Sequence, residues 1–262
     1  MKKRIIALIK YKPNSLREIF PSGEILFESQ EIHQMVDDDG IAWDDLRLIE
    51  YSEKGLYESD LRDFHNLKNN LEKYKVILLK PYSYLKDKYQ RLKFVIRNIF
   101  GDDTTIPLDK TKKETPKQKR LRLAGSNPNM ASGNILLENS EDQRSIYFVN
   151  IIKTRELAMY PVSYVGKQIS GRKALNTYSR VAYKYNTKHE NKFTFFSDAI
   201  NTIADNTGTD TEWETFVIVK YKSFTSLMDF NTEPMFRRAM VHKDAGVDHT
   251  YVYATYINNK KV

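Results

Sequence analysis

A histidine near the end of a predicted helix is the first side chain in this sequence that suggests chemistry. Residues 233–243 have helical spacing, with Pro234 in the first turn, where proline is tolerated, and Gly246 just beyond the end. His242 follows Ala239 by three positions, so it borders the apolar side of that helix. An imidazole in such a place can act as an acid or a base near neutral pH. His242 is therefore a candidate catalytic residue; the alternative is a cap on the last carbonyl groups of its helix.

Three more polar side chains lie where they need partners. Arg172 falls in the first turn of a helix predicted over residues 170–185, and a cation there opposes the helix dipole unless an anion faces it. That anion could be a ligand carboxylate or a structural one. Asn150 lies in a predicted strand among apolar neighbours, where its amide needs backbone or ligand partners. Tyr178 lies on the apolar stripe of the helix. We take Arg172 as a second candidate catalytic residue, and Asn150 and Tyr178 as candidates for binding a substrate.

Several kinds of site are excluded by residue types that the chain lacks. There is no cysteine, which removes disulfides, thiolate zinc sites, iron–sulfur clusters and cysteine nucleophiles. None of the five histidines pairs with another at a ligand spacing, so we expect no metal site. No apolar run approaches the roughly 20 residues that a membrane helix needs. We therefore expect a cytoplasmic protein without membrane contact.

The positive charge is concentrated in one segment. The formal net charge is +8, and residues 110–122 alone hold seven cations and one glutamate. The rest of the chain is close to neutral, and the basic segment has no interleaved aromatic residues for stacking on bases. A nucleic-acid partner is therefore not expected. The segment is interpreted as part of a solvated linker or long loop, and the alternative is a basic arm that contacts an acidic partner.

The second half of the chain has the element order of a ferredoxin-like unit, β-α-β-β-α-β. The spacing of its apolar residues predicts strands at 146–153, 192–200, 214–222 and 249–257, and helices at 170–185 and 233–243.

The first half has a similar order, with one inserted helix and no obvious last strand. Its pattern predicts strands at 4–12, 45–52 and 75–80, and helices at 22–36, 57–73 and 84–100. We therefore predict an α+β protein with three parts: a diverged ferredoxin-like half (1–100), a basic linker or long loop (101–144), and a ferredoxin-like domain (145–262).

A sheet whose strands are apolar on both faces must bury both faces against other parts of a protein. The segments Ile5–Ile9 and Val217–Val219 are continuous apolar runs, so one sheet face remains to be covered after the helices have packed on the other. Two such sheets packed face to face form an α+β barrel, either in a homodimer or as a tandem pseudo-dimer within one chain. The space between the sheets, or between sheet and helices, is a natural small-molecule pocket, which we expect beside His242.

Residues 146–257 resemble a known family. The ordered motifs are Phe-Val-Asn-Ile-Ile-Lys at 148–153, Ser-Gly-Arg-Lys-Ala at 170–174, the Trp-Glu to Lys-Tyr segment at 213–221, and His-Lys-Asp-Ala-Gly at 242–246. They are similar to an uncharacterised group of small dimeric α+β-barrel proteins, distant relatives of the antibiotic-biosynthesis monooxygenases. The resemblance implies a ferredoxin-like fold and adds Ser170 to the candidate substrate-binding residues.

Three functions stay open. The first is a small-molecule enzyme without an organic cofactor (an oxygenase, isomerase or lyase), acting on an apolar or aromatic substrate with an anionic group. Arg172 would hold the anion and His242 would move a proton. The second is a haem protein with His242 as the axial ligand, because tandem ferredoxin-like halves of this length resemble chlorite dismutases and dye peroxidases. The third is a non-catalytic binding or assembly protein that uses the basic segment.

Overall fold

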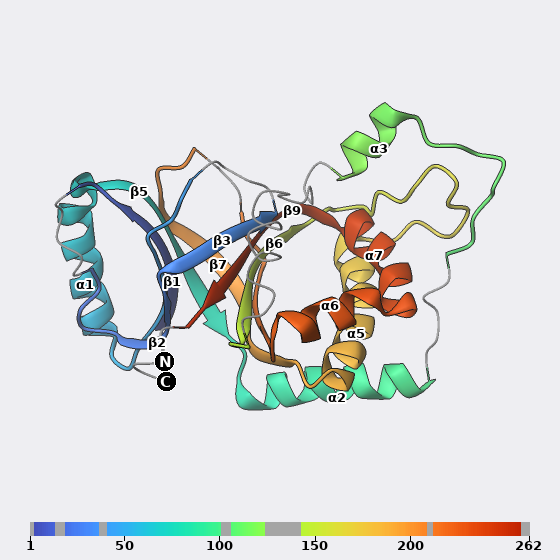
Figure 1. The fold of residues 1–262 in the computed structure, drawn as a ribbon. Helices are drawn as coiled ribbons and strands as arrows, with labels where there is room; N and C mark the ends of the chain where they lie inside the picture. Colours follow the sequence, from blue (N-terminus) through green and yellow to red (C-terminus); the bar gives the residue numbers. More distant parts are fainter. Residues whose placement is uncertain are drawn as a thin grey trace.

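The described residues form an antiparallel sheet of nine strands with helices outside it (Figure 1). The computed structural model describes residues 3–13, 19–36, 41–100, 106–123, 143–208 and 212–257. The strand order is β2-β4-β1-β5-β7-β8-β6-β9-β3. The α+β class predicted from the sequence is confirmed.

Both halves arrange their strands in the same ferredoxin-like order. In the first half, β2-β4-β1-β5 places the second, third, first and fourth strands side by side, and in the second half β7-β8-β6-β9 does the same. The first half comprises β1 (Lys3–Tyr11), β2 (Glu24–Ser29), β4 (Asp45–Tyr51), α1 (Lys54–Leu67), the short helix η1 (Lys68–Asn70) and β5 (Leu71–Pro81). The second comprises β6 (Ile146–Thr154), α5 (Gly171–Lys188), β7 (Lys192–Asp205), β8 (Thr215–Tyr221), α6 (Phe224–Thr232), α7 (Pro234–Gly246) and β9 (Val247–Tyr256).

Two long strand segments join the halves and close the sheet into a barrel. The first part of β7 pairs with β8 and its second part pairs with β5 of the other half. The two outermost strands of the sheet, β2 and β3 (Glu31–Val36), are separated in the chain by a single residue. Across this junction, Ser29 Oγ donates to Tyr256 O at 2.6 Å and Thr255 Oγ1 donates to Glu31 O at 2.8 Å. The tandem, intrachain form of the predicted barrel is therefore the observed one.

The barrel interior is packed with side chains from both halves. Along each strand, alternate apolar residues point inward, as expected for a sheet with two buried faces. At one end of the interior, Lys75 Nζ lies 4.0 Å from the centre of the Tyr251 ring and 3.6 Å from the Asp205 carboxylate. The interior cluster includes Ile6, Leu8, Leu46, Leu48, Ile77, Leu79, Val149, Ile151, Phe216, Ile218, Tyr251 and Tyr253. The covered faces of the two sheets thus form a core.

The helices cover the outside of the barrel on opposite sides (Figure 1). Helix α1 lies on the first half, whereas α5, α6 and α7 lie on the second. Helix α2 (Tyr84–Phe100) follows β5 of the first half but packs against α5 of the second. Among the helices of the described residues, none has the length and apolar character needed to span a membrane.

The helix predicted for residues 22–36 is wrong. This segment forms β2 and β3, which pair with β4 and β9. Its apolar residues fit a helical spacing, but Phe27 and Ser29 are buried alternately, as in a strand. The pairing with distant strands decides the structure here, and a local pattern does not contain it. The fourth strand that the first half seemed to lack is β5, and the crossover before it is α1.

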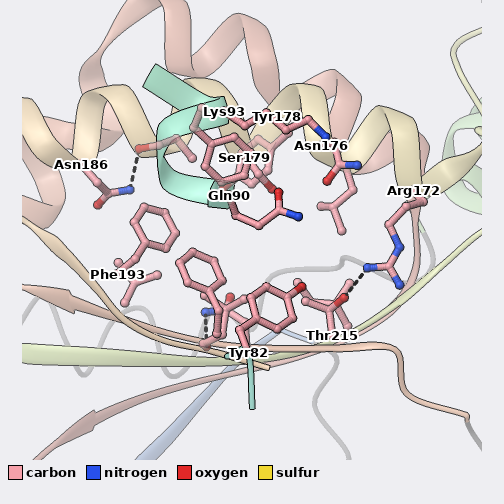
Figure 2. A pocket seen from close by; sticks show the side chains of 18 of the residues that line it. Tyr82, Gln90, Lys93, Arg172, Asn176, Tyr178, Ser179, Asn186, Phe193 and Thr215 are labelled. Carbon is pink, nitrogen blue, oxygen red and sulfur yellow. Dashed lines mark hydrogen bonds between the residues drawn. The ribbon is translucent and has the colours of Figure 1, made fainter. Parts of the chain in front are cut away.

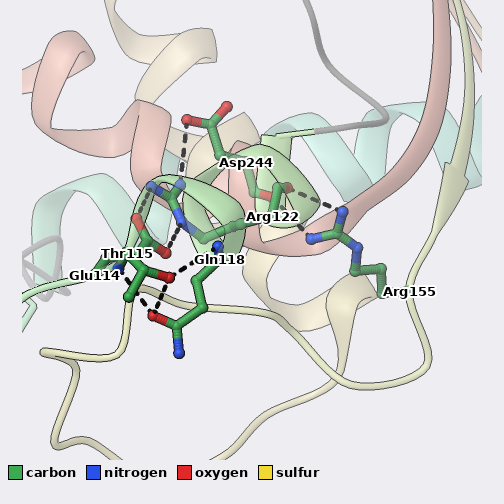
Figure 3. Close-up of polar contacts among 6 residues, drawn as sticks. All are labelled: Glu114, Thr115, Gln118, Arg122, Arg155 and Asp244. Carbon is green, nitrogen blue, oxygen red and sulfur yellow. Dashed lines mark hydrogen bonds and ion pairs between the residues drawn. The ribbon is translucent and has the colours of Figure 1, made fainter.

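The basic segment is partly folded rather than wholly a loop. It includes helix α3 (Pro116–Leu123), whose Arg122 is buried and forms two hydrogen bonds of 3.0 Å with the Glu114 carboxylate (Figure 3). Arg155 donates to Arg122 O at 3.0 Å and to Asp244 O, at the end of α7, at 3.2 Å. The bond from Arg155 to Arg122 O and the ion pair of 4.0 Å between Arg122 and Asp244 attach α3 to the second half. The other parts of the predicted linker, 101–105 and 124–142, lie outside the described residues.

The barrel junction makes a first prediction. Replacing Thr255 by Val keeps the shape of the side chain but removes the hydroxyl that binds Ser29 and Glu31. The Ser29 hydroxyl and the Glu31 carbonyl oxygen then each lose a hydrogen-bond partner. We expect a loss of about 1–3 kcal/mol in the free energy of unfolding, measured by urea denaturation. The matched control Thr177→Val, on α5 away from the junction, should change stability by less than about 0.5 kcal/mol. If Thr255→Val and Thr177→Val both change the free energy of unfolding by the same small amount, the hydrogen bonds at the junction do not stabilise the barrel.

Candidate functional site

A cavity of about 290 Å³ lies on the outer face of the second half, between the sheet and helices α5 and α2 (Figure 2). Its volume is close to the lower end of the range for small-molecule sites. The strands β6, β7 and β8 supply one wall and α5 the other, and α2 contributes from the first half. This cavity lies in one of the two places considered from the sequence, the space between sheet and helices.

One wall of the cavity is a stack of aromatic rings. Phe193 and Phe196 lie parallel, with ring centres 5.2 Å apart, and Tyr82 stacks on Phe196 at 6.3 Å. Phe94 of α2 and Tyr221 of β8 also line the cavity. A flat, apolar ligand would find favourable contacts along this wall, because aromatic rings prefer offset or edge contacts with one another.

Cations from α2 line the same cavity. Lys86, Lys93 and Arg97 follow one another at spacings of seven and four, so they share one side of the helix. Lys86 Nζ binds the Asp198 carboxylate at 2.7 Å. Neither Lys93 nor Arg97 forms an ion pair with a described residue. The cavity thus has a positive side that can attract an anionic group.

Asn150 and Tyr178, both predicted from the sequence, lie in the cavity wall. Asn150 Nδ2 donates to Phe148 O at 3.1 Å and to Val217 O at 3.4 Å, which satisfies the amide nitrogen and leaves the side-chain oxygen as an acceptor. Burial raises the pKa of Tyr178 well above its ordinary value, and the Asp244 carboxylate adds to the shift. Tyr178 therefore stays protonated and can only offer a neutral hydroxyl.

Arg172 also lines the cavity, but its charge already has a partner. Its Nη1 donates to Thr215 Oγ1 at 2.7 Å (Figure 2). Its Nη2 donates to Glu214 Oε2 at 2.9 Å. The anion expected beside a cation in the first turn of this helix is therefore the Glu214 carboxylate of the protein itself. A guanidinium has five donor hydrogens, so these two bonds leave others for a ligand at the edge of the cavity.

His242 and Ser170 are not brought to this cavity. His242 is buried on α7, and its Nδ1 shares a hydrogen bond of 2.7 Å with the Tyr160 hydroxyl. Tyr160 stacks in turn on Tyr164, so the imidazole is held by the loop before α5. Ser170 caps the N-terminus of α5 by accepting from Lys173 N at 3.3 Å. It lines a shallow, charged hollow on the other side of Arg172.

The segment after β5 contributes side chains that are not among the residues predicted from the sequence. Tyr82 donates to Asp198 Oδ1 at 3.2 Å, and Lys86 lies over its ring with Nζ 3.8 Å from the centre. Burial raises the pKa of Tyr82 to about 12, and the neighbouring Asp198 carboxylate contributes to the shift. The common face of Lys86, Lys93 and Arg97 was a readable signal in the sequence. What the sequence lacked was the position of α2 over the other half.

His242 lies outside the cavity, so a molecule bound in the cavity would not meet its imidazole. Its Nδ1 is bonded to Tyr160, which leaves only Nε2 for any further partner. The residues that line the cavity include no other histidine. Within the described part of the chain, no group of three or more His, Asp or Glu side chains is placed to hold a metal ion.

No family model and no curated protein matches the sequence. Similar solved structures include a protein of unknown function from Rhodopseudomonas palustris, which is 18% identical over 50% of this chain and 94% of that one, with a TM-score of 0.44. An anthrone oxidase-like protein is 7% identical over 100% and 95% of the two chains, with a TM-score of 0.43. A mutant chlorite dismutase from Candidatus Nitrospira defluvii, in complex with cyanide, is 8% identical over 97% and 90%, with a TM-score of 0.41. At such values these likenesses say nothing about the ligand of this chain.

The raised pKa of Tyr82 predicts an alkaline loss of stability. A tyrosine that ionises near its usual 10.0 in the unfolded chain and at about 12 in the folded one stabilises the fold below pH 10. That contribution is lost as the pH rises through this window, because the unfolded chain releases the proton first. Between pH 10 and 12, the free energy of unfolding measured by urea denaturation should fall less steeply with pH for Tyr82→Phe than for the unchanged protein. The two slopes should differ by at most about 1.4 kcal/mol per pH unit. Identical slopes for the two proteins would show that the Tyr82 hydroxyl is exposed to water and has an ordinary pKa.

Proposed function

We propose that the protein binds a small aromatic or apolar molecule with an anionic group in the cavity beneath α2 and α5. The observation that carries this proposal is the pairing of two features in one space: the ring stack of Tyr82, Phe196 and Phe193, and the cations Lys93 and Arg97. The rings suit the body of such a molecule. The cations suit its charge, because a charge-assisted hydrogen bond in a partly dry site is stronger than one in water.

The anionic group would bind at the α2 side of the cavity. Lys93 and Arg97 have no carboxylate among the described residues to neutralise them, whereas Arg172 and Lys86 each have one. The oxygen of Asn150 would accept a hydrogen bond from a hydroxyl or amine of the bound molecule. In this proposal Arg172 stabilises the cavity wall through its ion pair with Glu214, and Lys93 and Arg97 bind the anionic group of the ligand.

If the bound molecule undergoes proton transfer, the groups placed for it are Tyr82 and Asp198. Asp198 accepts from the Tyr82 hydroxyl and is held by Lys86, so Asp198 would act as the base through Tyr82: the tyrosine oxygen takes the proton of the bound molecule as its own proton moves to the carboxylate. Tyr82, with its pKa raised to about 12, is neutral before and after this transfer and relays the proton without holding a negative charge. In this proposal His242 has a structural role, and catalysis proceeds without a haem held by that residue.

The binding proposal is tested with a series of aromatic compounds of matched size. Isothermal titration calorimetry should show binding of 2-naphthoate and much weaker binding of the uncharged 2-naphthamide. Lys93→Gln and Arg97→Gln should each weaken 2-naphthoate binding about tenfold, which corresponds to the loss of one charge-assisted bond. Lys88→Gln changes an exposed lysine of the same helix that does not line the cavity, and it should leave the affinity unchanged. Equal affinities for acid and amide would contradict the proposal.

The assignment of proton transfer is tested by two substitutions at separate places. For any substrate that is turned over, Asp198→Asn should lower kcat by about 100-fold or more, since it removes the general base. His242→Asn, which keeps a polar group near Tyr160, should lower the melting temperature but retain kcat. The reverse pattern, with full activity in Asp198→Asn and loss in His242→Asn, would return the catalytic role to the histidine.

A further inference from the structure

Helix α3, in the basic segment, is fixed at its N-terminus and held against the second half. Gln118 N donates to Thr115 Oγ1 at 3.3 Å, and Thr115 N donates to Gln118 Oε1 at 2.9 Å (Figure 3). This reciprocal pair is a capping box, and Pro116 suits the first helical position. On the buried side of the helix, Arg155 donates to Arg122 O at 3.0 Å. The exposed side chains of α3 are therefore carried by an anchored element.

Six cations of the basic segment are exposed. We call them the basic patch: Lys110, Lys112, Lys113, Lys117, Lys119 and Arg120. Within the described part of the chain, Lys112 is the only one of the six that forms an ion pair, at 3.9 Å from Asp109. The other acid of the segment, Glu114, is already paired with the buried Arg122. The patch therefore presents a concentration of positive charge that the rest of the described protein does not neutralise.

Aliphatic side chains stand among these cations. The segment before α3 lies along the loop before α5, where Val165 N donates to Pro107 O at 3.0 Å. Beside this bond, Leu108 and Val165 are 51% and 54% exposed, and Leu121 of α3 is 58% exposed. Figure 1 shows α3 at one corner of the molecule, beside α7 and on the opposite side from α2. Positively charged and apolar side chains thus share one exposed region.

This combination distinguishes among the anionic surfaces that could meet the basic patch. A nucleic acid would attract the cations, but it offers no apolar medium to leucine and valine, and residues 106–123 contain no aromatic ring for stacking on bases. At protein interfaces arginine is enriched and lysine is depleted, whereas five of the six cations here are lysines. A bilayer with anionic lipids suits both features, because its headgroups attract clustered lysines and the acyl region below accepts aliphatic side chains.

We propose that α3 and the two loops beside it form a docking surface for a membrane that contains anionic lipids. The basic patch would lie at the level of the headgroups, and Leu108, Leu121 and Val165 would enter the boundary between headgroups and acyl chains. Docking of this kind uses no membrane-spanning helix, and it would replace the expectation, drawn from the sequence, of a protein without membrane contact. The proposal stands on the charge and exposure of this region and does not depend on the ligand of the cavity.

The electrostatic part of the proposal is tested by co-sedimentation of the full-length protein with vesicles. Vesicles of phosphatidylcholine with about one-third phosphatidylserine should bind the protein at least tenfold more tightly than pure phosphatidylcholine, and added salt should weaken that binding. The double variant Lys113→Gln with Lys117→Gln should weaken it at least fivefold. The matched control, Lys54→Gln with Lys184→Gln, makes the same change of net charge at exposed lysines of α1 and α5 and should leave binding nearly unchanged.

The apolar part is tested by a second pair of variants. Leu121→Ser with Val165→Ser should weaken binding to the phosphatidylserine vesicles about tenfold and leave its salt dependence unchanged, because the cations remain. The control, Leu85→Ser with Leu92→Ser, changes two residues that are 76% and 55% exposed on the side of α2 that faces solvent. It should bind as the unchanged protein does. All four positions are exposed, so the melting curves should match.

Four results would overturn the proposal. The first is no binding of the unchanged protein to vesicles with phosphatidylserine, and the second is equal binding to vesicles without it. The third is an equal loss of binding in a double variant and in its control. The fourth is tighter binding to polyglutamate or to a DNA duplex than to the vesicles, with dependence on Lys113 and Lys117 but not on Leu121 and Val165. That pattern would make an acidic protein or a nucleic acid the partner of the basic patch.

Discussion

The structure depends on covering two sheets whose strands are apolar on both faces. Each half has four strands in ferredoxin-like order, and its helices can bury only the outer face. The inner faces bury each other, so Val149 and Ile151 of one half share a core with Ile6 and Leu8 of the other. At roughly 25 cal/mol per Å² of apolar area, this mutual burial stabilises the closed barrel. The segments β2–β3 and β7, which pair with strands of both halves, fix how the two sheets are aligned when their inner faces pack together.

This constraint places the candidate site on the outside. Because the barrel interior is filled, the described cavity lies where helices meet the outer face of the second half. Helix α2 reaches that face because β5 of the first half pairs with β7 of the second, and its polar side then meets Phe193 and Phe196. The site thus combines an aromatic wall from one half with cations from the other, and it exists only in the closed barrel.

The sequence predicted the parts that depend on local pattern. The element order predicts the second half. Asn150 and Arg172 stand out because their types conflict with their surroundings, and Tyr178 because it lies on the apolar stripe of its helix. The helix expected at 22–36 failed because Phe27 and its neighbours satisfy two periodicities, and only pairing with strands far away in sequence chooses between them. The orientation of α2 could not be read, since its apolar stripe alone would direct it inward. His242 was misplaced for a similar reason: a position beside a stripe does not say which neighbour, here Tyr160, it meets.

A crystal structure of the protein with 2-naphthoate would show where an aromatic anion binds. We expect density for the ring system against Phe193 and Phe196, with the carboxylate at Lys93 or Arg97. Density elsewhere on the molecule, with a cavity filled by its own side chains, would contradict it.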